Sequence, residues 1–141
     1  MINSLGVKNY RNLKDLQIKS LGRVNLITGK NNVGKSSLLE AISIFVSGQN
    51  LAWLFKLLEN RGERYQVNSN VITNNTERNL KTFSALFHKH EISFFDENNT
   101  IQIGLLENID TQAQISSNAT TLVFRKYKSD IIGQSFHYGF Y

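Results

Sequence analysis

A short run of residues near the start of the chain combines glycine, lysine and serine at a spacing suited to phosphate binding. Residues 29–36 read GKNNVGKS, which fits the pattern G-x-x-x-x-G-K-[ST]. Gly29 and Gly34 permit backbone angles that a side chain would forbid, so the amides between them can turn inward as an anion nest. Lys35 is expected to reach the β- and γ-phosphates of a nucleoside triphosphate, and the Ser36 hydroxyl to ligate Mg²⁺. The pattern therefore predicts a Walker A loop.

The elements predicted on either side of this loop are those that such a loop requires. Residues 23–28 have the composition of a strand, and from Lys35 the apolar residues recur at the spacing of one helix face, which ends near Gly48. Two further strands are predicted at residues 2–9 and 13–20, joined by a turn. The helix would direct the positive end of its dipole at a bound phosphate. The alternative is a glycine-bounded turn between a strand and a helix that carries a surface lysine.

After the loop and its helix, the pattern of apolar residues predicts helices first and strands afterwards. Helices are expected at residues 51–60 and 77–88, separated by a polar, Asn-rich loop. Four short strands then follow, at residues 92–95, 100–106, 112–116 and 121–128. Residues 96–99 have turn composition, which favours a β-hairpin between the first two of these strands. The chain closes on an apolar, aromatic tail at 131–141.

Two segments resemble one family of ATPases. Residues 7–13 (VKNYRNL) and 25–42 (NLITGKNNVGKSSLLEAI) look like the start of the RecF/SMC/OLD-type ABC ATPases. The similarity is greatest to the AAA domains of OLD nucleases and of Gabija-like defence proteins. It is strong over residues 2–46 and modest over 80–106.

The resemblance implies a fold and an organisation of the chain. The fold expected is α/β: lobe I of an ABC-type P-loop ATPase head, with a core of mixed strands, the Walker A helix packed on it and an antiparallel β-subdomain. One domain would cover residues 1–141. Its parts would be the strands, loop and Walker A helix at 1–48, a helical segment at 49–90, and a β-rich segment with the apolar tail at 91–141. Such a head is expected to be incomplete, with a second lobe covering the tail.

Ligands and partners follow from the same resemblance. The ligands are ATP and Mg²⁺, and the preference for ATP over GTP rests on the resemblance alone. Heads of this family dimerise and act on DNA, in DNA repair or in antiviral defence. The expected partners are therefore a second ATPase head, as a homodimer partner or a missing C-terminal lobe, and DNA.

The residues expected to contact the nucleotide are those that match the family's motif. The loop residues are Gly29, Lys30, Asn31, Asn32, Val33, Gly34, Lys35, Ser36 and Ser37. Lys35 would also stabilise the charge that develops in the transition state. Arg11 and Asn12, in the turn after the first strand, would approach the phosphates or the base. For Arg11 the alternatives are a DNA contact and a solvated turn.

The sequence holds two weak candidates for the hydrolytic part of the site, and it lacks the Ser-Gly-Gly signature with which the family closes the site across the dimer. Residues 92–97 (ISFFDE) imitate a Walker B strand, in which Asp96 would hold Mg²⁺ and Glu97 would act as the base. The hairpin is favoured, because Ser93 interrupts a strand that should be buried. Gln134 stands at a spacing from the loop that suits a Mg²⁺-sensing Gln, or is an exposed Gln in the tail.

These observations predict ATP binding, with weak or absent hydrolysis by this chain alone. Two alternatives stay open. One is a complete small P-loop NTPase or kinase that uses Asp96 and Glu97. The other is a nucleotide-binding module without catalysis.

Composition and charge limit the other classes of site. Without Cys there can be no disulfide or thiolate metal site, and the three His (His88, His90 and His137) form no recognisable ligand set and are expected to flank the core or lie on the surface. No run of 18 apolar residues and no signal peptide occur, so a cytoplasmic protein without membrane contact is expected.

Residues 1–40 hold seven Lys or Arg against two Asp or Glu, which accounts for the net charge of +5. A triphosphate explains this excess first and DNA second. The RKYK cluster at 125–128 would touch DNA phosphates or end a solvated strand.

Overall fold

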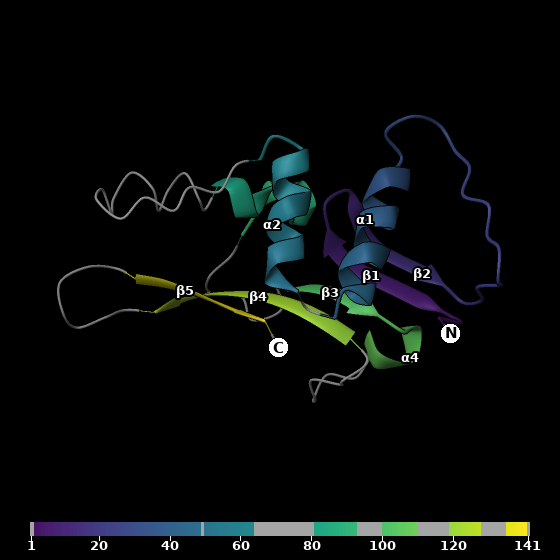
Figure 1. Cartoon of the computed structure of the whole chain (residues 1–141). Helices are drawn as coiled ribbons and strands as arrows, with labels where there is room; N and C mark the ends of the chain where they lie inside the picture. The colour runs from purple at the N-terminus through teal and green to yellow at the C-terminus, as the bar shows by residue number, and fades with distance from the viewer. Residues whose placement is uncertain are drawn as a thin grey trace.

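One antiparallel sheet forms the base of the fold. The structure, a computed structural model, describes residues 2–48, 50–63, 81–92 and 100–109 in full, and the backbone of 119–127 and 135–140. The strands pair in the order β2-β1-β3-β4-β5, and every pairing is antiparallel. Their bounds are β1 Leu5–Tyr10, β2 Leu13–Ile18, β3 Ile101–Gly104, β4 Ala119–Tyr127 and β5 Ser135–Phe140 (Figure 1). The N-terminal hairpin β1–β2 thus lies beside strands from the second half of the chain.

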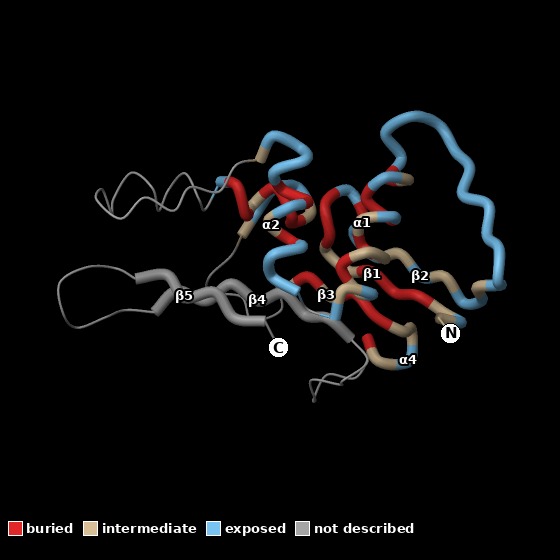
Figure 2. The backbone as a smooth tube through the Cα atoms, viewed as in Figure 1, coloured by how far each residue is buried: buried red, intermediate tan, exposed pale blue. Residues whose placement is uncertain are grey.

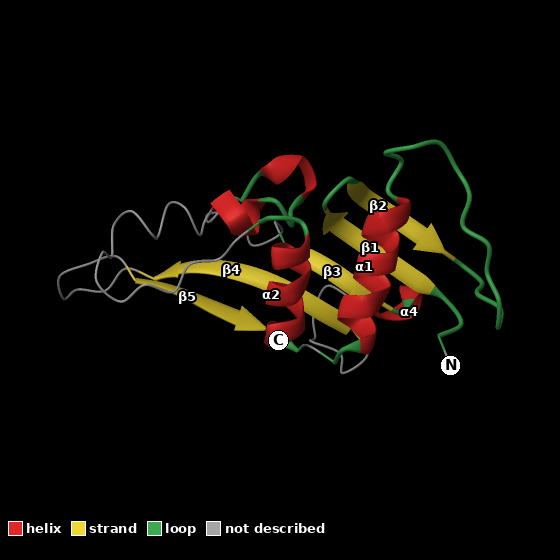
Figure 3. Cartoon of the chain, turned by 45° about the horizontal axis from the view of Figure 1, so that its top comes forward, coloured by secondary structure: helices red, strands yellow, loops and turns green. Residues whose placement is uncertain are grey.

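Two helices cover one face of this sheet. Helix α1 (Lys35–Val46) and helix α2 (Leu51–Asn60) lie next to each other on that face (Figure 3). Helix α2 begins after Asn50, whose side chain accepts a hydrogen bond from the Trp53 amide, as an N-cap does. The short α4 (Leu106–Ile109) packs against β1 and β3. None of the described helices has the length and apolar character needed to span a membrane.

The alternation of side chains along β1 explains how the helices are placed. Leu5 and Val7 are fully buried in the core, and Gly6 between them points to the opposite face. A Cβ on Gly6 would lie only 2.6 Å from Ile109 Cδ1, so any larger residue here would make the Ile109 side chain of α4 shift. The core side chains are Leu5, Val7, Tyr10, Leu13, Ile101 and Ile103 of the strands, Leu38, Ala41 and Ile44 of α1, Leu54, Leu57 and Leu58 of α2, and Phe83, Leu86 and Phe87.

Four predicted elements are confirmed. The strands expected at 2–9 and 13–20 are β1 and β2, and the helices expected from Lys35 and at 51–60 are α1 and α2. In these segments the apolar spacing matches the period of the element, and each one buries a single face.

The prediction of a strand at residues 23–28 is wrong. Residues 22–33 are exposed and belong to no strand or helix, and Figure 2 shows them as part of a long exposed loop. Val24 is 92 % and Leu26 88 % exposed. A strand needs a neighbour for its amides and carbonyls, and no described strand lies beside this segment. The expected core of mixed strands is therefore corrected too, since the described sheet is antiparallel throughout.

The prediction of a β-hairpin that pairs residues 92–95 with residues 100–106 is also wrong. Strand β3 pairs with β1 along one edge and with β4 along the other, so both of its edges are occupied. Ile92 belongs to no strand, and residues 93–99 lie outside the described residues. Turn composition suggested a local partner, whereas long-range pairing supplied both neighbours.

The remaining predicted elements are formed in part. Of the helix expected at 77–88, residues 81–84 are helical and the chain then turns into the 3-10 helix His88–His90, while 77–80 lie outside the described residues. The strand expected at 121–128 is β4, and that at 112–116 lies outside the described residues. The tail at 131–141 contains β5, where no strand was predicted.

Candidate nucleotide-binding site

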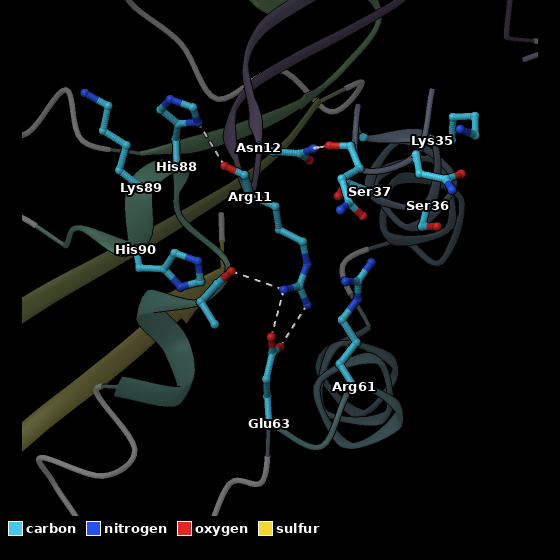
Figure 4. Close-up of a pocket in the computed structure, with 14 residues that line it drawn as sticks. Arg11, Asn12, Lys35, Ser36, Ser37, Arg61, Glu63, His88, Lys89 and His90 are labelled. Atoms are coloured by element: carbon cyan, nitrogen blue, oxygen red, sulfur yellow. Dashed lines mark hydrogen bonds and ion pairs between the residues drawn. The ribbon is translucent and has the colours of Figure 1, made fainter. Parts of the chain in front are cut away.

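The predicted phosphate loop lines a pocket together with segments that lie far from it in the sequence. The pocket has a volume of about 690 Å³, within the range that suits a nucleotide-sized ligand. Its walls come from the loop and the start of α1, the β1–β2 turn, the end of α2 and residues 85–90 (Figure 4). The lining residues are Arg11, Asn12, Asn31, Asn32, Gly34, Lys35, Ser36, Ser37, Arg61, Glu63, Ala85, His88, Lys89 and His90.

Both ends of the loop need glycine. Gly29 has a φ of 150° and Gly34 a φ of 107°, angles that L side chains rarely adopt. A Cβ on Gly34 would also lie 2.8 Å from Leu13 Cδ2 and 3.1 Å from Asn12 Nδ2, so β2 and its turn pack directly on the loop backbone. Asn12 Nδ2 donates to the Asn32 carbonyl at 3.2 Å. The side chain of Asn12 therefore connects the β1–β2 turn to the loop.

Lys35 is folded back over the loop. Its Nζ donates to the carbonyls of Gly29 at 2.7 Å and Lys30 at 2.6 Å. Helix α1 begins at this residue with no side-chain cap and no acidic residue in its first turn. Its first-turn amides are thus not competed for by a carboxylate, as an anion site at a helix start requires.

The chemistry of Ser36 fits Mg²⁺. Its hydroxyl is a hard oxygen ligand, it lines the pocket, and it has no hydrogen-bond partner among the described residues. No group of three or more His, Asp or Glu that could hold a metal occurs in the described part of the chain. Ser36 thus offers Mg²⁺ one hydroxyl oxygen, and further ligands would come from the phosphates and water.

Arg11 lines the same pocket and is surrounded by carboxylates. Nη1 and Nη2 donate to the two oxygens of Glu63 at 3.0 and 2.9 Å, and Nε lies 2.9 Å from Glu40 Oε2. Nη1 also donates to the Ala85 carbonyl, and the side chain is 8 % exposed. A contact from Arg11 to phosphate stays a prediction, and the structure adds that protein oxygens already surround this guanidinium.

Burial and charge hold Arg11 and Tyr10 in fixed protonation states. Burial raises the pKa of the Tyr10 phenol, against the opposing charge of Arg11 and with support from Glu40. Burial by itself would lower the pKa of Arg11, but the hydrogen bond to Glu63 and the neighbouring Tyr10 outweigh it and raise that pKa. The phenol therefore stays neutral and donates to Glu40 Oε2 at 3.1 Å.

The turn that carries Arg11 is held against residues 86–90. The Arg11 amide donates to the Leu86 carbonyl at 2.7 Å, and His88 Nδ1 donates to the Arg11 carbonyl at 2.9 Å. Because a carbonyl can only accept, the proton lies on Nδ1 and Nε2 is left for other contacts. Lys89 and His90 both have a φ of 59°, which non-glycine residues rarely adopt. This turn places both histidines at the wall of the pocket.

The structure brings part of the predicted site together. Arg11, Asn12 and the loop and helix residues Asn31 to Ser37 surround one pocket, Val33 excepted. Asp96, Glu97 and Gln134 lie outside the described residues. Arg125, Lys126 and Tyr127 belong to β4, and Lys128 also lies outside the described residues. Arg61, Glu63 and Lys89 also line the pocket, although no motif or spacing in the sequence marks them.

Several known proteins match shorter stretches of this chain. An uncharacterized protein of Methanocaldococcus jannaschii is 45 % identical over 49 residues, which are 35 % of this chain and 22 % of that protein. An ATP/GTP phosphatase of Helicobacter pylori is 48 % identical over 46 residues, 33 % of this chain and 12 % of the phosphatase. The DNA replication and repair protein RecF of Rickettsia prowazekii is 44 % identical over 50 residues, 36 % of this chain and 14 % of RecF. The chain thus matches less than a quarter of the length of each relative.

A family model extends the similarity over almost the whole chain. The model described as AAA ATPase domain matches residues 1–137. Together with the RecF match, it confirms the resemblance to the N-terminal region of a RecF/SMC-type ATPase. The geometry of the loop between Gly29 and Gly34, which opens onto α1, agrees with a P-loop domain of this kind. The chain therefore belongs to the AAA ATPase domain family.

Proposed function

We propose that residues 29–37 bind ATP with Mg²⁺ and that the chain is the first lobe of a RecF/OLD-like ATPase head. The observation that carries this proposal is the loop itself. It is bounded by two glycines at positive φ, it opens directly onto α1, and its residues Asn31, Asn32 and Gly34 line a pocket of about 690 Å³. Backbone amides in this arrangement favour the multiple charges of a triphosphate.

Each loop residue has a part in this proposal. The amides of the loop and of the first turn of α1 donate to phosphate oxygens. Lys35 Nζ exchanges the carbonyls of Gly29 and Lys30, which it contacts at 2.7 and 2.6 Å, for phosphate oxygens. Ser36 supplies its hydroxyl to Mg²⁺, which when bound neutralises phosphate charge.

Hydrolysis belongs to the completed head in this proposal. Lys35 stabilises the developing charge, while the base and the closing signature come from a second lobe and a second head. Gln134 is the candidate that this chain offers for a Mg²⁺ contact, while Asp96 and Glu97 would supply the Mg²⁺ contact and the base in the alternative of a complete small P-loop NTPase. DNA repair or antiviral defence is the proposed setting, with DNA as a partner, supported by the similarity to RecF.

The first test is binding of Mg-ATP measured by calorimetry on the purified full chain. The wild type is expected to bind, and Lys35→Ala to lose roughly tenfold to a hundredfold in affinity, because it removes charge-assisted hydrogen bonds. Lys14→Ala is the matched control, since it removes one positive charge at an exposed position of β2 outside the pocket. Absence of binding by the wild type, or equal binding by Lys35→Ala, would overturn the proposal.

A second test concerns turnover. Release of phosphate from ATP by the chain alone is expected to stay close to the background rate. Rapid turnover that Glu97→Gln abolishes would instead identify a complete small P-loop NTPase.

A further inference from the structure

Arg61, the residue directly after α2, places a second guanidinium at the wall of the pocket. Its Nε donates to Glu40 Oε1 at 2.6 Å, and its side chain is 36 % exposed. Within the described residues, neither Nη1 nor Nη2 of Arg61 has a hydrogen-bond acceptor. The guanidinium is thus anchored at one nitrogen, and its two terminal amino groups are open to a ligand.

Arg61 differs from Arg11 in how many of its guanidinium donors have protein acceptors. Both arginines line the pocket and both contact Glu40, Arg11 at Oε2 and Arg61 at Oε1. In Arg11, however, Nε, Nη1 and Nη2 all have protein acceptors, and the side chain is almost fully buried. Arg11 thus has one N–H of Nη2 left in a side chain that is 8 % exposed, whereas both terminal amino groups of Arg61 are left for a bound molecule.

The orientation of Arg61 directs these donors toward the phosphate loop. Figure 4 shows the side chain extending from the end of α2 toward Ser37 at the start of α1. A planar guanidinium with two parallel N–H donors matches two oxygens of a phosphate group, and a carboxylate on Nε restricts its rotation.

We propose that Arg61 is a phosphate-binding residue of the nucleotide site, with Glu40 as its positioning residue. The polyphosphate lies between the loop amides and Lys35 on one side and Nη1 and Nη2 of Arg61 on the other. This assignment rests on the proposed binding of ATP at residues 29–37. It adds a binding residue that lies 26 positions after the loop lysine and belongs to no motif.

The test measures Mg-ATP affinity by calorimetry for the full-chain wild type, Arg61→Ala and Arg61→Lys. Loss of two charge-assisted hydrogen bonds is expected to weaken binding by roughly tenfold or more in Arg61→Ala. Arg61→Lys keeps the charge but not the paired donors, so it is expected to bind more weakly than the wild type as well. Titration with ADP and AMP in parallel shows which phosphate is contacted, because the difference between variants disappears once that phosphate is absent.

Two controls separate a binding role from a structural one. Lys56→Ala removes one charge from the exposed side of α2, where Lys56 pairs with Glu59, and is expected to bind like the wild type. The nucleotide-free melting temperature of Arg61→Ala is expected to fall by less than about 4 °C, since partly exposed ion pairs add little stability. If Arg61→Ala does not fold, the Mg-ATP affinity of Arg61→Lys alone decides whether Arg61 binds phosphate.

The outcomes also distinguish this inference from the proposed function. Wild-type affinity in Arg61→Lys, or in a folded Arg61→Ala, overturns the role of Arg61 while ATP binding at the loop stands. Equal affinity of the wild type and Lys35→Ala overturns the proposed function itself.

Discussion

Arg11 and Glu63, which are 52 residues apart in the sequence, form a bidentate ion pair at the wall of the pocket. The Nη1–Oε1 distance is 3.0 Å and the Nη2–Oε2 distance is 2.9 Å. The same guanidinium contacts Glu40 of α1 through Nε at 2.9 Å. One buried side chain thus connects the β1–β2 turn, helix α1 and the segment that follows α2. These three elements line the same pocket as the predicted phosphate loop, so the network holds the walls of that pocket together without a ligand.

Glu63→Gln is expected to destabilise the protein. It removes the carboxylate that pairs with a guanidinium of 8 % exposure, and Arg11 keeps only Glu40 as a charged partner. Because Glu63 itself keeps some solvent contact, the expected loss in free energy of unfolding is about 1–2 kcal/mol, measured by urea denaturation. Lys56→Ala, which breaks an exposed ion pair, is expected to cost well under 1 kcal/mol. Equal effects of the two substitutions would show that the buried network adds no stability.

Gly34→Ala is expected to impair both the loop and its binding of Mg-ATP. The substitution forces a methyl group to within 2.8 Å of Leu13 Cδ2 at a φ of 107°. Strain of this kind costs about 1–3 kcal/mol, which thermal or urea unfolding would measure. Gly48→Ala is the matched control, since Gly48 also has positive φ but its Cβ would meet no atom within 4 Å. An equal loss in the two variants would show that the contact with Leu13 is unimportant.

The buried phenol of Tyr10 predicts a loss of stability in alkaline solution. Its pKa in the folded protein is raised above the ordinary value of 10.0, mainly by burial. The stability from this shift is complete below pH 10 and declines as the pH rises beyond it, because the unfolded chain then releases a proton that the folded chain retains. The slope from one such group approaches about 1.4 kcal/mol per pH unit. Urea midpoints measured from about pH 9 to pH 11 should therefore fall more steeply in the wild type than in Tyr10→Phe, and parallel curves would contradict the shift.

The exposed loop before α1 predicts tolerance to polar substitution. Leu26 is 88 % exposed, so Leu26→Ser is expected to change the free energy of unfolding by less than about 0.5 kcal/mol. Leu38→Ala, in the core side of α1 at 7 % exposure, is expected to cost about 2–5 kcal/mol. A large loss in Leu26→Ser would mean that residues 23–28 are packed as the predicted strand.

Local signals were sufficient where an element depends on its own residues. Helix α2 was predicted at its observed bounds, because its apolar spacing lies within one stretch of the chain. Residues 23–28 carry an equally clear strand pattern but form no strand, since a strand also needs a partner. For the same reason the neighbours of β3 were predicted wrongly. Its pairing with β1 joins residues almost a hundred positions apart, and no local pattern reports such a pairing.

The sequence by itself determined the glycine-bounded loop before α1, which is the predicted phosphate loop. Gly29, Gly34, Lys35 and Ser36 stand within eight residues, and a nest of consecutive amides needs little more than glycine at its ends and a helix after it. Only the tertiary structure decided the opposite wall of the pocket, with Arg61, Glu63 and the histidines of the 88–90 turn. Those residues meet the loop because α1 and α2 pack on one face of the sheet and the β1–β2 turn docks against residues 86–88. The packing of helices on a sheet depends on buried contacts across the whole domain, and the spacing of charged residues along the chain carries no record of it.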